Sequence, residues 1–362
     1  MRAFIFLNEM KTKAFLIVSF FGLLLQGCSH VSVITDRTEM AADDEVLYSA
    51  LFYIHADADY LFHDSEGNAR QADERALSAA MKIGSEASSG EVFIIHHKRQ
   101  RKILGLFPRR SNEMFYFRNG ELQRQLTYRY EDSSEPFLST EKIFYEQVAT
   151  LSDNGLPQKY FFFFGHELPN KDGKGYHNSM PNVDVSGETL SAGMKQFLSE
   201  PTRKFDLVTL STCSNGTPQM AEQMIPVSHY MLASPQNLHL SYMDVDAFLN
   251  LEENPATPMP EIAEAMASRT FERLKREVRT EVALTIYDLR EISLYIDELA
   301  AMVEEYEQEY NPNRYRDNID CADLDFFYSE VFKNGLETWF SPAAFGTRAS
   351  AGVHSGWGCK GN

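Results

Sequence analysis

Three short apolar runs dominate the pattern of hydrophobic and polar positions in the middle of the chain. They cover Tyr160–Phe164, Asp206–Leu210 and Tyr230–Ala233, and turn-forming residues follow each of them. Segments with helical spacing separate the runs. Short β-branched or aromatic runs of this kind are typical of strands that are buried on both faces. The pattern therefore predicts successive strand–helix units of a parallel sheet, joined by right-handed crossovers.

The same alternation of apolar runs and helical spacing extends along most of the chain. Asn119-Gly120 between two apolar runs predicts a β-hairpin over residues 114–128. The Gly-, Asn- and Pro-rich Leu168–Gly187 predicts a loop over the strand ends. The further elements that the pattern predicts are strands over Val46–Ile54, Val92–Ile95 and Val282–Tyr287, helices over Ala72–Ser85, Phe137–Leu151, Leu190–Ser199, Glu261–Arg279, Asp288–Tyr310 and Asp320–Asn334, a helix beginning at Gln219–Met224, and a turn or linker over Asn250–Pro260.

Reactive side chains follow two of the three central runs. His166-Glu167 comes after the first run, and Cys213 comes after the second, 47 positions later (213 − 166). Loops at the carboxyl ends of parallel strands are where α/β proteins bind ligands. Nucleophilic cysteine catalysis needs a thiol with an imidazole beside it, and a spacing of roughly 50 residues between His and Cys occurs in caspase-like enzymes. The alternatives are a small buried Cys213 and a structural His166.

Length and charge limit the classes of function. The 362 residues suffice for one large α/β domain or two smaller ones, and 43% hydrophobic content supports a substantial core. The formal net charge is −18. Such a charge argues against nucleic acid or an anionic membrane surface as the main partner. It is compatible with basic substrates or with calcium.

The N-terminal segment has the pattern of an export signal. Lys11 and Lys13 precede the apolar run Ala14–Leu25, which is followed by Gln26-Gly27-Cys28. The ending resembles a bacterial lipoprotein signal, which implies that Cys28 is lipidated and becomes the first residue of the mature protein. A single transmembrane anchor is the alternative, although the run is short for one. We expect residues 1–28 to be the signal, 29–45 a tether and 46–362 the folded domain, which the lipid would hold at the bacterial cell envelope.

Three further cysteines remain once Cys28 is assigned to the lipid. An odd number in an oxidising compartment suggests one disulfide and one free thiol. Cys321 and Cys359 both lie in the C-terminal part, outside the pattern of strand ends. We therefore expect these two to pair and Cys213 to be free.

The order of these blocks resembles the clostripain family of cysteine peptidases, within the caspase–gingipain–legumain superfamily. The resemblance extends from about Val46 to about Phe332, and the blocks that carry it are Ala50–Ile54 with Asp57-Ala58-Asp59, Tyr160–His166, Phe205–Glu222, Tyr230–Ser234, Val282–Leu289 and Tyr315–Phe326. It implies a caspase-like three-layer α/β/α sandwich with a mostly parallel central sheet. It also implies a Cys213–His166 dyad, an oxyanion hole formed by the backbone N–H groups of Glu167 and Cys213, and a substrate pocket flanked by Ser211 and Ser234.

Two positions depart from the family pattern. The family usually has His-Gly and Asp-Ala-Cys, whereas this chain has His166-Glu167 and Ser211-Thr212-Cys213. The family's Asp selects Arg or Lys before the cleaved bond, and Ser211 carries no charge for that purpose. A neutral or small side chain suits Ser211 better. For Ser211 and Ser234, turn chemistry is the alternative to substrate binding.

The sequence does not predict a metal or another cofactor. Asp57, Asp59 and Asp64 could form an oxygen-rich calcium site, but a solvated acidic loop is the interpretation that the sequence favours. His96 and His97 are adjacent in a predicted strand, so they should point to opposite faces and share no metal. His177 and His229 are weaker candidates for acid–base chemistry than His166.

The sequence thus favours an exported, lipid-anchored cysteine endopeptidase that acts on peptides or proteins as a monomer. The alternative from another class is a catalytically inactive lipoprotein of the same fold that serves as a binding or structural module. A third hypothesis is a non-peptidase acyl transferase that uses the same dyad.

Overall fold

The computed structural model describes residues 32–36, 46–58, 60–63, 67–99, 102–103, 107–108, 112–128, 136–148, 158–239, 242–309 and 324–358. The chain divides into two compact units, Met1–Ser32 and Val33–Asn362. No helix in the described ranges is long and apolar enough to cross a membrane. The predictions that lie outside these ranges concern the signal with Cys28, most of the tether, Asp59, Asp64, Cys321 and Cys359.

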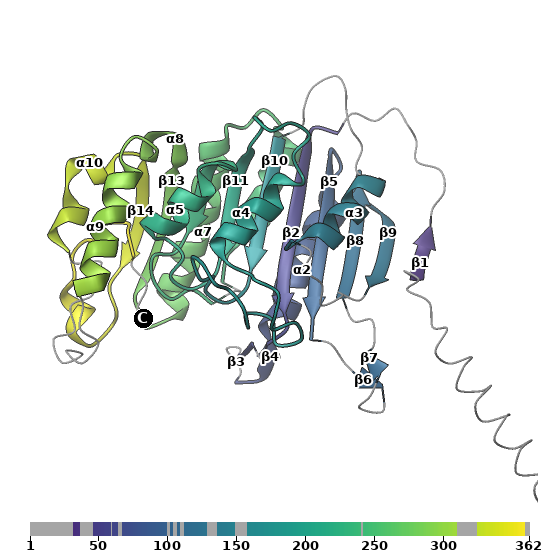
Figure 1. Ribbon diagram of the computed structural model, residues 1–362, viewed down its shortest axis with the longest axis horizontal. Coiled ribbons are helices and arrows are strands. Elements are labelled where there is room, and N and C mark those ends of the chain that lie inside the picture. Colours follow the sequence, from purple (N-terminus) through teal and green to yellow (C-terminus); the bar gives the residue numbers. More distant parts are fainter. Residues whose placement is uncertain are drawn as a thin grey trace, which may run out of the picture. The chain divides into compact units, whose positions relative to one another are not determined.

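A mixed sheet runs through the domain, with a parallel centre (Figure 1). Its strand order is β1-β9-β8-β5-β2-β10-β11-β12-β13-β14. The central strands pair in parallel, as the sequence pattern predicts. These strands are β2 (Tyr48–Ala56), β5 (Gly90–Lys98), β10 (Gln158–Phe164), β11 (Phe205–Ser211) and β12 (Ser228–Ala233).

Antiparallel strands extend the sheet on both sides of the parallel centre. On one side β5 pairs with β8 (Asn112–Arg118), which pairs with β9 (Glu121–Tyr128). On the other side β12 pairs with β13 (Val282–Asp288), which pairs with β14 (Leu336–Ser341). The remaining strands are β1 (Ser32–Asp36), which lies inside the predicted tether, and the pairs β3 (Leu61–His63) with β4 (Ala69–Gln71) and β6 (Lys102–Ile103) with β7 (Phe107–Pro108).

The predicted hairpin forms between β8 and β9. Asn119 and Gly120 both have positive φ, at 52° and 75°. Two consecutive left-handed residues define the tight turn whose twist matches that of paired strands, and Asn-Gly is the sequence that favours it. Arg118 pairs with Glu121 directly across this turn.

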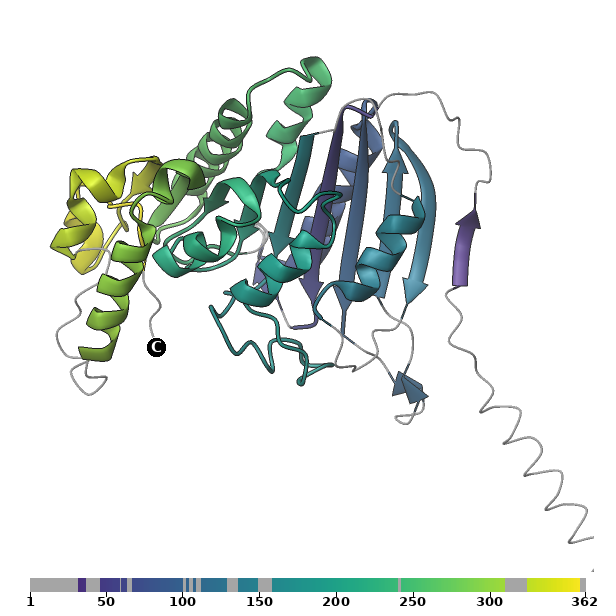
Figure 2. The same cartoon turned by 45° about the horizontal axis from the view of Figure 1, so that its top comes forward.

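Helices cover both faces of the sheet and complete the three-layer α/β/α architecture that the resemblance implies (Figure 2). One face carries α2 (Ala72–Glu86), the short η1 (Asp246–Leu249) and α6 (Asn250–Glu253), and α7 (Met259–Glu277). The other face carries α3 (Ser139–Val148), α4 (Gly187–Lys195), α5 (Pro218–Met224), α8 (Leu289–Ile292), α9 (Ile296–Glu309), η4 (Asp325–Tyr328) and α10 (Glu330–Lys333).

The central strand β10 shows why its sequence is aromatic throughout. Phe161 and Phe163 pack into the core below one face, while Tyr160, Phe162 and Phe164 pack into the core below the other. Successive side chains of a strand point to opposite faces, so a strand covered on both faces needs apolar residues at every position. Phe52 of β2 stacks on Phe162 with ring centroids 4.5 Å apart.

Three predictions of helices and loops need correction. The helix expected over residues 288–310 is broken into α8 and α9 at Ser293, whose hydroxyl donates to the Arg290 carbonyl and competes with the helical backbone. The helix expected over residues 320–334 is two short pieces, η4 and α10, because Ser329 caps the second one at the Val331 N–H. The linker expected over residues 250–260 contains α6, and β14 lies in a region with no predicted strand.

Candidate functional site

His166 and Cys213 lie beyond the carboxyl ends of adjacent parallel strands. β10 and β11 run in register up to the pair Phe164–Ser211, and each candidate residue comes two positions after its strand's last residue. The Gly165 N–H continues the pairing by donating to the Ser211 carbonyl over 3.3 Å. The register offset of the two strands therefore equals the sequence spacing between the imidazole and the thiol, which places both residues at one level of the sheet.

Two tyrosines hold the backbone of His166 from both sides. The His166 N–H donates to the Tyr60 hydroxyl over 3.0 Å, and the Tyr176 hydroxyl donates to the His166 carbonyl over 2.9 Å. The Tyr60 ring also lies against the imidazole, with ring centroids 4.1 Å apart. The imidazole itself is exposed at the surface. These contacts fix the position of His166 while leaving its ring accessible to a substrate.

Cys213 is half-buried and is the free cysteine among the described residues. Its thiol donates to the Leu238 carbonyl over 3.3 Å. The next residue, Ser214, has a φ of 50°, a left-handed conformation that non-glycine residues rarely adopt, and its N–H donates to the Gln236 carbonyl. Such backbone strain is typical of functional sites, where surrounding contacts maintain it.

Asn215 ties the loop after Cys213 to the loop after His166. Its side-chain oxygen accepts hydrogen bonds from the Leu168 N–H, at 2.9 Å, and from the Thr212 hydroxyl, at 2.6 Å. Its amide group donates to the Leu168 carbonyl at 2.9 Å. Asn215 is almost fully buried, so these bonds replace water at every partner. No sequence pattern indicates this role, because the bonds to Leu168 join residues 47 positions apart.

Burial affects the ionisation of both His166 and Cys213. Burial raises the pKa of the Cys213 thiol, the Leu238 carbonyl contact partly offsets this, and the nearby Glu167 carboxylate raises it further. Burial also lowers the pKa of His166. Both shifts favour the neutral forms of the two groups.

The two serines predicted to flank a substrate pocket are buried. Ser234 donates its hydroxyl to the Ala283 carbonyl at 2.7 Å and accepts from the Gln236 N–H at 3.1 Å. Ser211 is the last residue of β11 and is fully buried. The bond from Gln236 is typical of a turn, which is the alternative interpretation of Ser234, whereas the bond to Ala283 joins it to β13.

The backbone around Glu167 is held by hydrogen bonds on both sides of the N–H group that is predicted for the oxyanion hole. The N–H groups on either side of it, at His166 and Leu168, are bound to Tyr60 and Asn215. Beyond Cys213, the Ser214 N–H is bound to the Gln236 carbonyl. The backbone of both segments is thus fixed around the two N–H groups that are candidates for the oxyanion hole, while the half-buried Glu167 brings a carboxylate close to Cys213.

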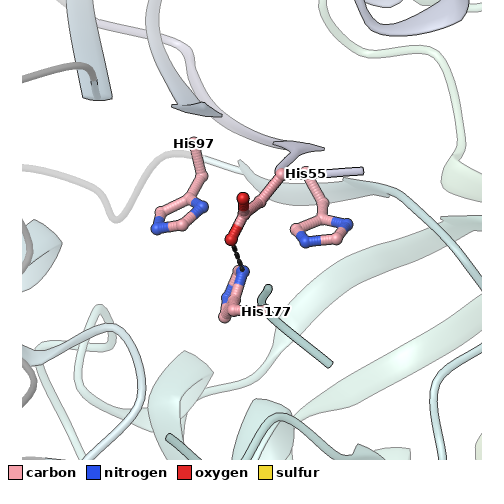
Figure 3. Close-up of side chains that lie close together, drawn as sticks. His55, His97 and His177 are labelled. Atoms are coloured by element: carbon pink, nitrogen blue, oxygen red, sulfur yellow. Dashed lines mark ion pairs between the residues drawn. The ribbon is translucent and has the colours of Figure 1, made fainter. Parts of the chain in front are cut away.

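A group of histidines that the sequence did not single out together lies beside the dyad. His55, Asp57, His97 and His177 come from two strand ends and the loop after His166, and all four are buried (Figure 3). His96 lies on the opposite face of β5, where it meets Asp73, so the two adjacent histidines share no site, as predicted. Asp57, one of the three aspartates considered for calcium, is fully buried beside these imidazoles and does not belong to the solvated acidic loop that the sequence favours. Nitrogen ligands favour transition metals over calcium.

Comparisons with known proteins agree with this architecture. No protein-family model matches the chain, and a search of the curated proteins finds no match. An inactive zymogen C11 protease from Parabacteroides distasonis is similar in structure over 86% of this chain and 91% of its own, with 13% identity and a TM-score of 0.51. A secreted C11 cysteine protease from Bacteroides thetaiotaomicron, in complex with an irreversible peptide inhibitor, is similar over 68% and 67% of the two chains, with 12% identity and a TM-score of 0.47.

The structural neighbours are thus C11, or clostripain-family, cysteine proteases. At these identities the likeness establishes the fold, and it confirms the mostly parallel α/β sheet flanked by helices that the sequence predicts.

Proposed function

We propose that this chain, which has the caspase-like fold of C11 proteases, is a cysteine endopeptidase whose dyad is Cys213 and His166. The observation that carries the proposal is their register: each residue lies two positions beyond the paired strand ends Phe164 and Ser211. A thiol and an imidazole at adjacent strand ends are what covalent cysteine catalysis requires.

The reaction follows from neutral starting groups. The Cys213 thiol turns away from the Leu238 carbonyl, and His166 takes its proton as sulfur attacks the carbonyl carbon of the peptide bond. The negative charge that develops on the carbonyl oxygen is accepted by the backbone N–H groups of Glu167 and Cys213. Collapse of the tetrahedral intermediate breaks the C–N bond, and His166 returns the proton to the leaving amine. A water molecule then hydrolyses the acyl-enzyme by the same steps.

The specificity of this site is proposed to be for a neutral residue before the cleaved bond. Ser211 is uncharged and buried at the position where a basic-selective family member has Asp. A pocket without a buried carboxylate gives no compensation for desolvating a Lys or Arg side chain. The substrate is proposed to be a peptide or protein that a monomeric enzyme meets outside the cytoplasm, with the lipid at Cys28 holding it at the envelope.

The proposal is tested with a fluorogenic peptide library that varies the residue before the cleaved bond. We expect cleavage by the wild type, with activity reduced at least about 1,000-fold in Cys213→Ala and in His166→Ala, because the dyad acts as a unit. His229→Ala is the matched histidine control and should retain full activity, since His229 lies near the amino end of β12, away from the strand ends that carry the dyad. Cleavage that persists in Cys213→Ala would refute the dyad.

A second candidate function is an inactive binding module of the same fold. Two observations favour it: the thiol is bound to a backbone carbonyl, and the Glu167 carboxylate raises the pKa of Cys213. The neighbour from Parabacteroides distasonis is itself an inactive zymogen, which shows that the fold accommodates a silent state. Silence of the wild type across the library, together with slow alkylation of Cys213 before and after limited proteolysis, would favour the binding module.

A further inference from the structure

Four buried side chains converge at the carboxyl ends of β2 and β5. His55 and His97 are register partners on these neighbouring strands, and Asp57 follows the end of β2. His177 reaches them from the loop that begins after His166. One nitrogen or carboxylate oxygen from each residue lies within 4.8 Å of those of the other three (Figure 3). No member is more than 1% exposed, which is unusual for residue types that normally seek water.

Outer contacts orient the side chains so that their remaining polar atoms face one another. The Nδ1 of His55 is bound to the Tyr60 hydroxyl at 2.6 Å, and the Nε2 of His177 is 3.3 Å from the Tyr53 hydroxyl. The opposite nitrogen, Nε2 of His55, is buried and has no hydrogen-bond partner among the residues that the structure describes. Asp57 is held by Ser179, which donates to its two oxygens from its N–H and its hydroxyl.

This arrangement matches the outer shell of a metal centre. Ligating histidines almost always use their second nitrogen in a hydrogen bond that fixes the ring, and a ligating carboxylate is itself hydrogen-bonded. The His177 Nδ1 lies 4.0 Å from an Asp57 oxygen, at a distance too long for a hydrogen bond between them. A buried nitrogen without a hydrogen-bond partner destabilises the folded state by about 1–3 kcal/mol. A ligand bound by the inward-facing atoms of the cluster would remove this cost.

The donor atoms of the cluster also suit a cation. The neutral imidazole nitrogen is the form of histidine that binds metals. Three nitrogens and one oxygen select borderline divalent transition metals over calcium or magnesium, which prefer oxygen ligands.

We propose that His55, Asp57, His97 and His177 bind one divalent transition-metal ion of the Zn²⁺ type. Four protein ligands, all of them buried, indicate a structural site rather than a catalytic one. A tetrahedral zinc centre has ligand atoms about 3.4 Å apart, so binding draws these side chains inward by about an ångström. This inference is independent of the proposed peptidase activity.

The site would fasten the loop after His166 to the ends of two strands. His177 and Ser179 belong to this loop, whereas His55, Asp57 and His97 belong to β2, the turn after it and β5. The Tyr60 hydroxyl that contacts His55 also accepts the His166 N–H, and the His55 and His166 ring centroids are 6.5 Å apart. A bound ion therefore orders the segment that positions the candidate acid–base group.

The test uses full-length protein with Cys213→Ala as background, so that the dyad thiol cannot bind the metal. The protein is stripped with a chelator and loaded with Zn²⁺ or Co²⁺, both in the folded state and during refolding because the site is buried. Bound metal is measured after gel filtration, together with the thermal midpoint and the visible Co²⁺ spectrum. The comparison variants are His97→Gln and His177→Gln, and the control is His96→Gln, the neighbour of His97 on the other face of β5.

We expect about one Zn²⁺ per chain and a raised thermal midpoint in the background protein and in His96→Gln. In His97→Gln and His177→Gln, affinity should fall on the order of 100-fold, with no rise in midpoint. Co²⁺ should give the strong visible bands of tetrahedral coordination without thiolate charge transfer. If the ligand variants do not fold, the Co²⁺ spectrum decides alone. Absence of bound metal by both loading routes, equal binding by all variants, or an octahedral Co²⁺ spectrum would overturn the proposal.

Discussion

At the scale of single residues, Tyr60 connects the candidate acid–base group to the rest of the strand-end network. Its hydroxyl accepts the His166 N–H and is bound to His55, while its ring lies against the His166 imidazole. Its hydroxyl binds the backbone of His166, so we expect Tyr60 to act as a positioning residue. This hydroxyl limits the motion of His166. Because its hydrogen bonds are formed, burying it costs little free energy.

Replacing Tyr60 by Phe keeps the ring and removes the hydroxyl. We expect kcat to fall about tenfold with little change in KM, because a misplaced base weakens the transition state more than substrate binding. The free energy of unfolding should fall by about 1 kcal/mol. Tyr295→Phe is the matched control, since its buried hydroxyl donates to the Asn334 carbonyl. It should lose similar stability and retain kcat; an equal loss of kcat in both variants would contradict the positioning role.

Glu167 gives a prediction about the thiol alone. Its carboxylate raises the pKa of Cys213 in addition to the larger effect of burial. Glu167→Gln removes the charge, so the pKa of the thiol falls and the thiolate fraction at a given pH rises. The pH profile of iodoacetamide alkylation should shift to lower pH, with faster alkylation at neutral pH. Glu188→Gln, an exposed change on α4, is the control, and Cys213→Ser gives the background from other cysteines; an unchanged profile for Glu167→Gln would exclude the charge effect.

The sequence predicted the positions of residues that directly follow a strand. It did not predict the contacts that are made between loops. His166 and Cys213 follow two apolar runs, so their neighbouring positions could be predicted from the pattern. Tyr60, Tyr176 and Asn215 hold them through contacts between loops whose conformations have no periodicity. For the same reason, the sequence did not predict that His177 lies beside His55 and His97.

At the scale of elements, helix α3 carries a buried carboxyl that makes its packing sensitive to pH. Glu141 is fully buried and accepts a hydrogen bond from the Tyr128 hydroxyl of β9 at 2.6 Å. Burial raises the pKa of Glu141 from 4.5 to about 7. The folded protein thus keeps a proton that the unfolded chain has already lost, so stability falls as pH rises from about 4.5 to about 7 and stays lower above that range.

Glu141→Gln should remove this loss while its carbonyl oxygen still accepts from Tyr128. At pH 8 the free energy of unfolding should rise by about 2–3 kcal/mol, with little gain at pH 4.5, as urea titrations at the two values would show. Glu146→Gln on the exposed side of α3 removes a surface ion pair with Lys142 and should change stability by less than about 0.5 kcal/mol. A gain of the same size at both pH values would show that the carboxyl does not titrate as described.

Elements with strong periodicity were predicted well, and those defined by distant partners were not. The hairpin at Asn119-Gly120 and the strands of the parallel centre follow local rules. β14 forms because β13 offers an edge for pairing, which the local pattern of residues 336–341 does not reveal. Side-chain hydrogen bonds from Ser293 and Ser329 likewise interrupt helices whose spacing favours continuation.

At the scale of the whole molecule, the C-terminal segment 354–358 completes the structure around Cys213. Trp357 is fully buried, its indole N–H donates to the Phe332 carbonyl at 2.7 Å, and its ring lies 4.9 Å from that of Tyr287. The Gly358 N–H then donates to the Gly216 carbonyl in the loop after Cys213. A side chain at Gly216 would collide with the Tyr287 hydroxyl, so these parts fit only with glycine there.

Trp357→Ala should therefore weaken the whole domain. The large cavity and the lost hydrogen bond should lower the free energy of unfolding by about 3–5 kcal/mol, measured by urea unfolding. Val353→Ala, at the position just before this segment and 66% exposed, should change it by less than about 0.5 kcal/mol. A small loss in Trp357→Ala would mean that the segment rests on the domain without stabilising it.

The bond between Gly358 and Gly216 also affects the kinetics of unfolding. It joins segments far apart in sequence, so the entropy of closing that long loop favours its formation after the central sheet has assembled. Contacts that form after the folding transition state change the rate of unfolding and leave the rate of folding almost unaffected. The C-terminal segment would then slow unfolding. The strength of its contacts would determine how long the loop that carries Cys213 keeps its folded conformation.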